Sequence, residues 1–120
     1  MNFDDAITAH SQWKLRLKSV VDGTSRETLD PAVIAVDDKC ALGQWIRGDA
    51  KAYEGLEEYR DLMAQHAQFH RCAAEVLKLA LAGRKGEASA QLENTGEFTE
   101  ASIRTISAIR KLRRKVEQAP

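Results

Sequence analysis

Two of the three histidines in this 120-residue chain, His66 and His70, lie four residues apart. On a helix this spacing places both imidazoles on one face, one turn apart, where they can bind a single metal ion. His10 falls on the apolar stripe of an earlier predicted helix, and Cys40 can supply a thiolate. Three imidazoles and one thiolate form a tetrahedral donor set suited to Zn²⁺. These four residues are therefore a candidate metal site.

The same residues also have a structural interpretation. A histidine on an apolar face is commonly a hydrogen-bonded core residue, and a cysteine such as Cys40 can pack as a small hydrophobic side chain. A pair of histidines four residues apart also arises by chance. Against this, all three histidines fall on predicted buried stripes, and burying imidazoles without partners costs free energy. From spacing alone, metal binding and core packing both stay open.

The elements that would position these residues are helices. Apolar residues recur at steps of three and four over residues 3–22, over 56–82 and again from residue 92 to 116, with Gly96 inside the last helix. A short helix is predicted over residues 40–46, and Pro31 argues against a helix through the connector at residues 24–33. We expect one all-α domain over residues 1–120, an antiparallel four-helix bundle with a short extra helix that carries Cys40.

Three motifs surround the candidate ligands. His10 and Trp13 form H-x-x-W, residues 40–45 read C-A-L-G-Q-W, and residues 66–70 read H-A-Q-F-H. In this order they resemble the chemoreceptor zinc-binding (CZB) domain family, and the resemblance spans roughly residues 3–82. It implies that His10, Cys40, His66 and His70 are the zinc ligands of a helical bundle.

The resemblance further implies a sensory or regulatory role, because such domains are attached to chemoreceptors and to diguanylate cyclases. No methyl-accepting or cyclase domain lies within these 120 residues, so we expect a stand-alone module. Its expected partner is a signalling protein of the chemoreceptor or diguanylate cyclase type, or a second copy in a homodimer. Either zinc occupancy or oxidation of the Cys40 thiolate could be the signal.

Four protein ligands would fill a tetrahedral zinc shell and leave no position for a reactive water. Ala67 also stands where an HExxH metalloprotease has its general base. We therefore expect a protein that is not an enzyme. Trp13 and Trp45 are expected to pack around the metal and exclude water, although ordinary core packing predicts nearly the same position and is the favoured main role. Asp37, Asp38 or a backbone carbonyl is expected to accept hydrogen bonds from the ligands.

Composition and charge exclude several other classes. Eighteen basic residues balance eighteen acidic ones, which gives no global attraction to nucleic acid. The chain shows no export signal and no membrane span, so we expect a cytoplasmic protein with reduced thiols. The last helix is locally basic, a pattern typical of a solvated face or of a docking surface: Arg104, Arg110, Lys111, Arg113, Arg114, Lys115.

Two rival interpretations accompany the zinc module. One is a structural, zinc-stabilised or plain protein-interaction bundle whose histidines only support the fold. The other is a di-iron or oxygen-binding bundle, which needs more inward carboxylates than the predicted stripes offer. Cys72 is expected on the face of its helix that points away from the site, as a packing residue or a partly exposed thiol.

Overall fold

The computed structural model describes residues 3–24, 29–36 and 40–118, with the side chain of residue 118 left out. Its elements are α1 (Phe3–Asp22), α2 (Pro31–Ile34), α3 (Ala41–Arg47), the 3-10 helix η1 (Asp49–Tyr53), α4 (Glu57–Leu81), α5 (Lys85–Leu92) and α6 (Glu97–Gln118). The described residues contain helices and no strand, which confirms the all-α prediction. Among those helices, none combines the length and the apolar character that crossing a membrane requires.

The two helices that carry histidines agree with the sequence pattern. In α1 the buried residues follow steps of three and four, and they include His10 and Trp13. In α4 the same spacing buries His66 and His70 within 25 residues. Each helix stops at a glycine with positive φ, Gly23 at 77° and Gly83 at 80°. The following amide bonds back to the last turn, as is common where glycine ends a helix.

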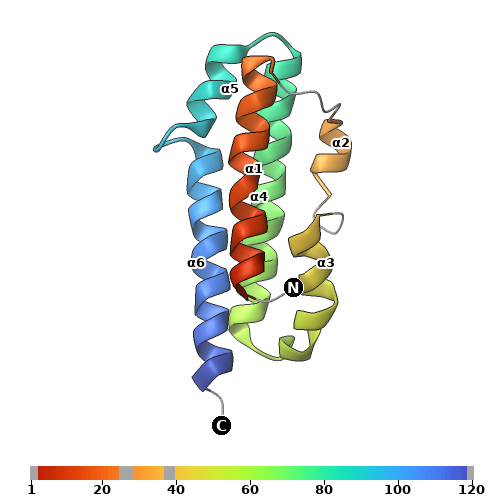
Figure 1. The fold of residues 1–120 in the computed structure, drawn as a ribbon, viewed down its shortest axis with the longest axis vertical. Coiled ribbons are helices and arrows are strands. Elements are labelled where there is room, and N and C mark those ends of the chain that lie inside the picture. The colour runs from red at the N-terminus through yellow and green to blue at the C-terminus, as the bar shows by residue number, and fades with distance from the viewer. Residues whose placement is uncertain (1–2, 25–28, 37–39, 119–120) are drawn as a thin grey trace.

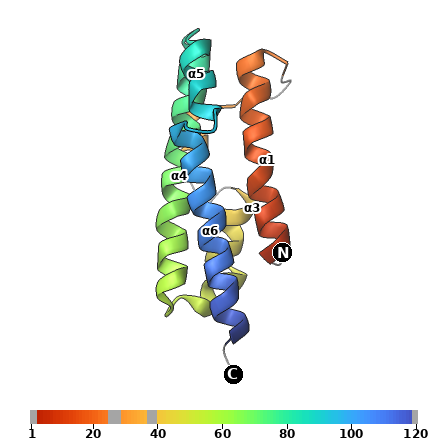
Figure 2. The ribbon, with the colours of Figure 1, turned by 90° about the vertical axis from the view of Figure 1, so that its left-hand side faces the viewer.

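The long helices do not all alternate in direction. α1 and α4 run the same way, from the lower to the upper end of Figure 1, and α6 runs back down (Figures 1 and 2). The short elements α2, α3 and η1 form the descending connection between α1 and α4. His10 therefore lies on a helix that runs parallel to α4. The short elements α2, α3 and η1 occupy the place that a descending long helix would have in an antiparallel four-helix bundle.

The predicted fourth helix is wrong as a single element. It is divided into α5 and α6, which are separated by residues 93–96. A Cβ at Gly96 would collide with the backbone carbonyl oxygens of Ala90 and Gln91. Gly96 therefore allows a close approach of α6 to the end of α5, rather than being a tolerated glycine inside a continuous helix.

The connector around Pro31 also contains a helix that the sequence analysis did not predict. Asp30 caps α2, and its Oδ1 accepts a hydrogen bond from the backbone N–H of Ala32 at 2.9 Å. Proline occupies the first turn of α2, where its missing N–H would have no partner in any case. Pro31 starts this short helix rather than preventing it.

Two hydrophobic clusters fill the bundle, one above the other. The upper cluster consists of Trp13, Leu17, Val21, Ile34, Phe69, Ala73, Ala74, Val76, Leu77, Ala88, Leu92, Phe98 and Ala101. The lower cluster consists of Ala6, Leu42, Trp45, Ile46, Ala50, Tyr59, Leu62, Ala108, Ile109 and Leu112. Cys40 packs against both clusters, so it lies at their junction.

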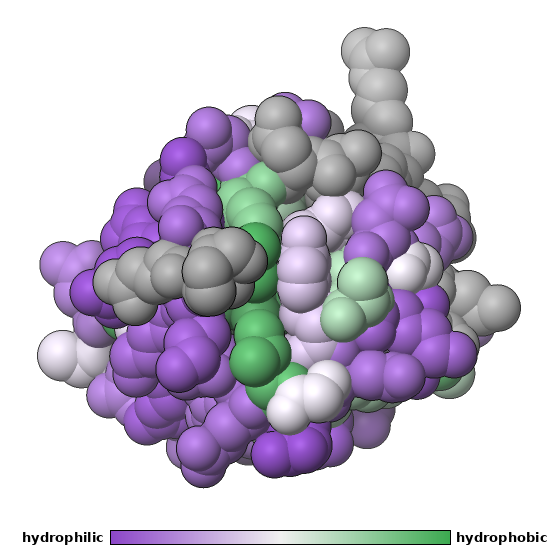
Figure 3. All heavy atoms as spheres, turned by 90° about the horizontal axis from the view of Figure 1, so that it is seen from below, coloured by the Kyte–Doolittle hydropathy of each residue, from purple (hydrophilic) through white to green (hydrophobic). Residues whose placement is uncertain are grey.

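The lower cluster extends to the surface at one end of the bundle. Viewed from that end, a hydrophobic strip crosses between hydrophilic margins (Figure 3). Partly buried members of the cluster stand near the ends of helices there: Phe3 starts α1, Leu56 precedes α4 and Val116 is close to the end of α6. The lower cluster is therefore not fully covered at this end of the bundle.

Candidate metal centre

Three of the four predicted ligands converge at the junction of the two clusters. The Sγ atom of Cys40 lies 3.3 Å from Nε2 of His66 and 3.3 Å from Nε2 of His70. The two Nε2 atoms are 3.0 Å apart. Both imidazoles are buried, at 2% and 1% exposure, and Cys40 is half-buried. This group of one sulfur and two nitrogens can hold a metal ion.

Cys40 reaches this point because it starts a helix. It is the N-cap of α3, with extended backbone angles, and its Sγ accepts a hydrogen bond from the backbone N–H of Gly43 at 3.2 Å. The cap sets the direction of the side chain relative to the helix. α3 packs against α1, and in this position the Cys40 thiol at its start lies next to the histidines of α4.

A backbone carbonyl fixes the His70 ring. Its Nδ1 lies 2.7 Å from the carbonyl oxygen of Ile34, the last residue of α2. A carbonyl can only accept, so Nδ1 carries the proton, and the other nitrogen, Nε2, faces Cys40 and is the one available to bind a metal ion. Metal-bound histidines are typically held in this way by their second nitrogen. His70 is therefore oriented as a ligand by a neighbouring element.

His10 lies beside this group, but its nitrogens are not among the converging donor atoms. Its ring packs against Phe69 with centroids 4.1 Å apart, and its Nε2 lies 3.2 Å from Oγ of Ser102 on α6. His10 is 2% exposed, and its Nδ1 has no hydrogen-bond partner in the described part of the chain. His10 and His66 line one cavity of about 150 Å³ between α1 and α3.

Burial keeps His10 and His66 neutral. Desolvation, together with the nearby His70 ring, lowers the pKa of His10 to about 4. Desolvation has the largest effect on His66, and charge repulsion from His70, His10 and Arg47 adds to it, so that the pKa of His66 is lowered to about 3. A metal-binding imidazole must be unprotonated at the nitrogen that binds, so both rings are in the required charge state near neutral pH.

Trp13 covers one side of the group. Its ring meets His70 edge-on at 5.7 Å between centroids, and the guanidinium of Arg16 lies 4.2 Å from the Trp13 ring centroid. Trp13, Cys40 and His70 line a further cavity of about 230 Å³ together with residues of α2 and its flanks. This cavity connects the half-buried thiol with the surface beside α2.

Of the other predicted neighbours of the metal, only Trp45 is among the described residues. Trp45 belongs to the lower cluster and meets Phe3 edge-on at 5.2 Å between ring centroids. The two aspartates, residues 37–38, are outside the described residues. Cys72 packs against the upper cluster, its Sγ accepts from Nε2 of Gln68 at 3.7 Å, and burial raises the pKa of its thiol.

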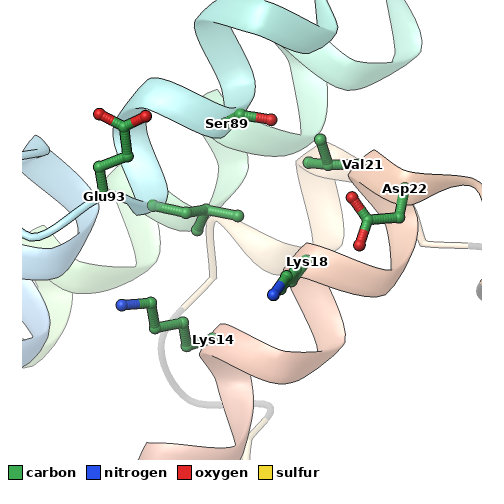
Figure 4. A pocket seen from close by; sticks show the side chains of 7 residues that line it. Lys14, Lys18, Val21, Asp22, Ser89 and Glu93 are labelled. Carbon is green, nitrogen blue, oxygen red and sulfur yellow. The ribbon is translucent and has the colours of Figure 1, made fainter.

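A separate hollow of about 300 Å³ lies between α1 and α5. Figure 4 shows Lys14, Lys18 and Asp22 of α1 on one side, and Ser89 and Glu93 on the other. None of the four candidate ligands lines it. It is therefore distinct from the candidate metal centre.

The donor set fits a zinc ion. Tetrahedral zinc, with bonds of about 2.0 Å to nitrogen and about 2.3 Å to sulfur, separates neighbouring donor atoms by roughly 3.3–3.6 Å. The observed separations of 3.0 and 3.3 Å are close to this spacing. The buried Nδ1 of His10 is a further donor atom in need of a partner. Among biological metals, few besides zinc bind well to a thiolate and imidazoles together.

Two contacts of the ligands were not predicted from the sequence. A backbone acceptor was among the expectations, but nothing in the sequence indicates that the carbonyl of Ile34 would be this acceptor. Ser102 follows Phe98 by four residues and precedes Thr105 by three, on the stripe of α6 that faces the bundle. A small polar residue on a buried stripe is the signal that could have identified it.

Comparison with known proteins agrees with this geometry. The family model described as the chemoreceptor zinc-binding domain matches residues 10–77, more than half of the chain. The matched region begins at His10 and includes Cys40, His66 and His70, whereas α5 and α6 lie beyond it. No curated protein and no solved structure gave a match.

Proposed function

The chain belongs to the chemoreceptor zinc-binding domain family, a family of zinc-binding signalling domains, and from this premise we propose that His10, Cys40, His66 and His70 together hold one zinc ion. The convergence of Cys40, His66 and His70 within 3.3 Å of one another carries the proposal. The orphaned nitrogen of His10 supports its inclusion as the fourth ligand.

The bound zinc would supply a stable crosslink between elements rather than a catalytic water, since four protein ligands complete its shell. His10 extends from α1, Cys40 from the start of α3, and the two remaining ligands from α4. Binding would hold three otherwise separate elements in one arrangement. We infer a regulatory module that is not an enzyme and that acts through contacts with a signalling partner in the bacterial cytoplasm, where the Cys40 thiol stays reduced.

Metal analysis of the protein purified without a histidine tag tests this function. The expected result is about one zinc per chain, with no visible absorption. A plain interaction bundle would contain no metal, and a di-iron protein would absorb in the visible range. Either of these two results would overturn the proposal.

Sensing of oxidants is a second candidate role for the same site. The cavity of about 230 Å³ beside Trp13 supports it, because it gives a small molecule a route to the Cys40 thiolate. Hydrogen peroxide would transfer one oxygen atom to the thiolate sulfur, its O–O bond breaking as the S–O bond of the sulfenate forms, and the remaining oxygen would leave as water. Peroxide treatment should then release zinc from the wild type. Unchanged zinc content would exclude this role while leaving the zinc site intact.

The output pathway follows from the family rather than from the fold. We propose a chemotaxis or cyclic-di-GMP pathway, with a chemoreceptor, a diguanylate cyclase or a second copy of the chain as partner. The exposed basic residues of α6, such as Arg110 and Arg114, support an acidic docking partner. Light scattering tests the homodimer: a monomer at high micromolar concentration would contradict it.

A further inference from the structure

One side chain of α6 contacts a candidate ligand, although α6 lies outside the family match. The Oγ atom of Ser102 is 3.2 Å from Nε2 of His10, a contact between residues 92 positions apart in the sequence. His10 is buried and Ser102 is half-buried. The contact therefore joins α1 to α6 directly at the edge of the metal centre.

The two nitrogens of the His10 ring have different surroundings. Nε2 faces the serine hydroxyl, whereas Nδ1 is buried with no hydrogen-bond partner among the described residues. A buried nitrogen without a partner costs free energy. If Nδ1 carries a lone pair rather than a proton, a metal ion can satisfy it.

His70 shows how this division works in the same site. Its Nδ1–H donates to the Ile34 carbonyl, which leaves Nε2, facing Cys40, as the nitrogen available to bind a metal ion. One nitrogen is held by a neighbouring element and the other is presented as a donor, the arrangement typical of metal-bound histidines. On His10 the nitrogen next to a neighbouring element is Nε2 and the one without a hydrogen-bond partner is Nδ1, the reverse of the assignment on His70.

We propose that Ser102 is a positioning residue of the metal centre. Its Oγ accepts a hydrogen bond from Nε2–H of His10, which leaves the lone pair on Nδ1 as the fourth donor to a divalent metal ion such as zinc. This inference rests on the zinc site proposed above and extends that site to α6. Because α6 packs along both α1 and α4, zinc binding would change the contacts of α6, the helix whose last turns are basic.

The test compares zinc affinity, by competition with a chelator, among full-length variants. Ser102→Ala should bind zinc about 10–100-fold more weakly than the wild type, the usual loss when the hydrogen-bond partner of a metal-bound histidine is removed. Ser102→Thr retains the hydroxyl and should restore most of the affinity. Ser107→Ala is the matched control, since Ser107 is a half-buried serine of the same helix and should leave the affinity unchanged.

A spectroscopic measurement separates positioning from general stability. In nitrogen-15 NMR of the zinc-loaded wild type, we expect His10 to be bound through Nδ1 and protonated at Nε2. Binding through Nε2 would overturn the proposal, and so would an unchanged affinity in Ser102→Ala. This NMR result holds even if the alanine variant fails to fold. If the wild type binds no zinc, the proposed function itself fails; if it binds zinc and only these results are contrary, the role of Ser102 alone is wrong.

Discussion

The three donor atoms that converge in the candidate centre come from two very different regions. His66 and His70 lie well inside the 25 residues of α4, which packs along α6 more extensively than any other pair of elements in the described structure. Cys40 precedes a helix of seven residues, in a connection whose other elements have four and five residues. One region consists of the long helices α4 and α6, which we call the frame. The other region is a series of short helices that pack against it.

This contrast shows where a metal would matter most. A helix as long as α4 keeps its backbone hydrogen bonds and its buried face without help from a ligand. The described connection from α2 to η1 consists of helices of four, seven and five residues, each too short to be stable without packing against the long helices. We call this stretch, residues 31–36 and 40–53, the short-helix segment. Zinc would add a further link between this segment and α4.

The largest expected effect is the loss of the cysteine ligand. Cys40→Ser retains an atom that can cap α3 but replaces a soft thiolate with a hydroxyl, which is a poor zinc ligand. Zinc affinity should fall by more than about 100-fold, beyond the loss caused by removing an outer hydrogen-bond partner. Chelator competition measures it, with Cys72→Ser as the control. An unchanged affinity would remove Cys40 from the ligand set.

Removing the metal should affect the two regions unequally. After zinc is taken out with a chelator, amide hydrogen exchange in residues 40–53 should accelerate on the order of tenfold or more, while the middle of α4 changes little. The reason is that the metal would hold Cys40 against α4, whereas α4 is held by its own packing along α6. Equal acceleration in both regions would contradict the comparison.

A smaller effect is expected from a hydrogen bond between the regions. The hydroxyl of Tyr59 on α4 donates to the carbonyl of Ile46 on α3 at 2.8 Å, and the bond is buried. Tyr59→Phe should lower the free energy of unfolding by about 1–2 kcal/mol, because the carbonyl loses its donor. Urea denaturation measures this, with Tyr53→Phe as the matched control. Equal losses in the two variants would show that the Ile46 contact is not the cause.

The smallest effect is expected inside the frame. Thr105 on α6 donates to the carbonyls of Ala101, at 2.9 Å, and of Gln65 on α4, at 3.2 Å. Both carbonyls lie within helices, where they can keep backbone partners. Thr105→Val should therefore cost about 1 kcal/mol or less. The exposed Thr8→Val on α1 controls for the helix propensity of valine. A loss larger than that of Tyr59→Phe would reverse the ranking of the two regions.

The sequence predicted the long helices α1 and α4 best. The apolar spacing of α1 and α4 repeats over many turns, so periodicity predicted both helices and their buried histidines, while Gly23 and Gly83 indicated where they end. In the short-helix segment no period can develop within four residues, and α2 was missed although Asp30 and Pro31 form a standard start. At Gly96 the pattern of apolar residues continued through a break that only the approach of α6 to Gln91 reveals.

The site was predictable to a similar, partial degree. Motif spacing identified Cys40, His66 and His70, whose donor atoms converge. The hydrogen-bond partners of the rings were not predicted: the Ile34 carbonyl belongs to the backbone, and Ser102, although a small polar residue on a buried stripe, is 92 residues from His10. Contacts of this kind depend on how the elements pack, which local periodicity does not encode.

The two tryptophans lie in different parts of the molecule, so their fluorescence can report on these parts separately. Trp13 lies against the His70 ring and beneath the Arg16 guanidinium, whereas Trp45 packs on Phe3 at the start of α1. The emission of the first indole should respond to the metal centre, and that of the second to the seating of α3. With Trp13→Phe or Trp45→Phe, each event acquires its own intrinsic fluorescence signal, so the filling of the site and the docking of α3 can be timed separately without an added dye.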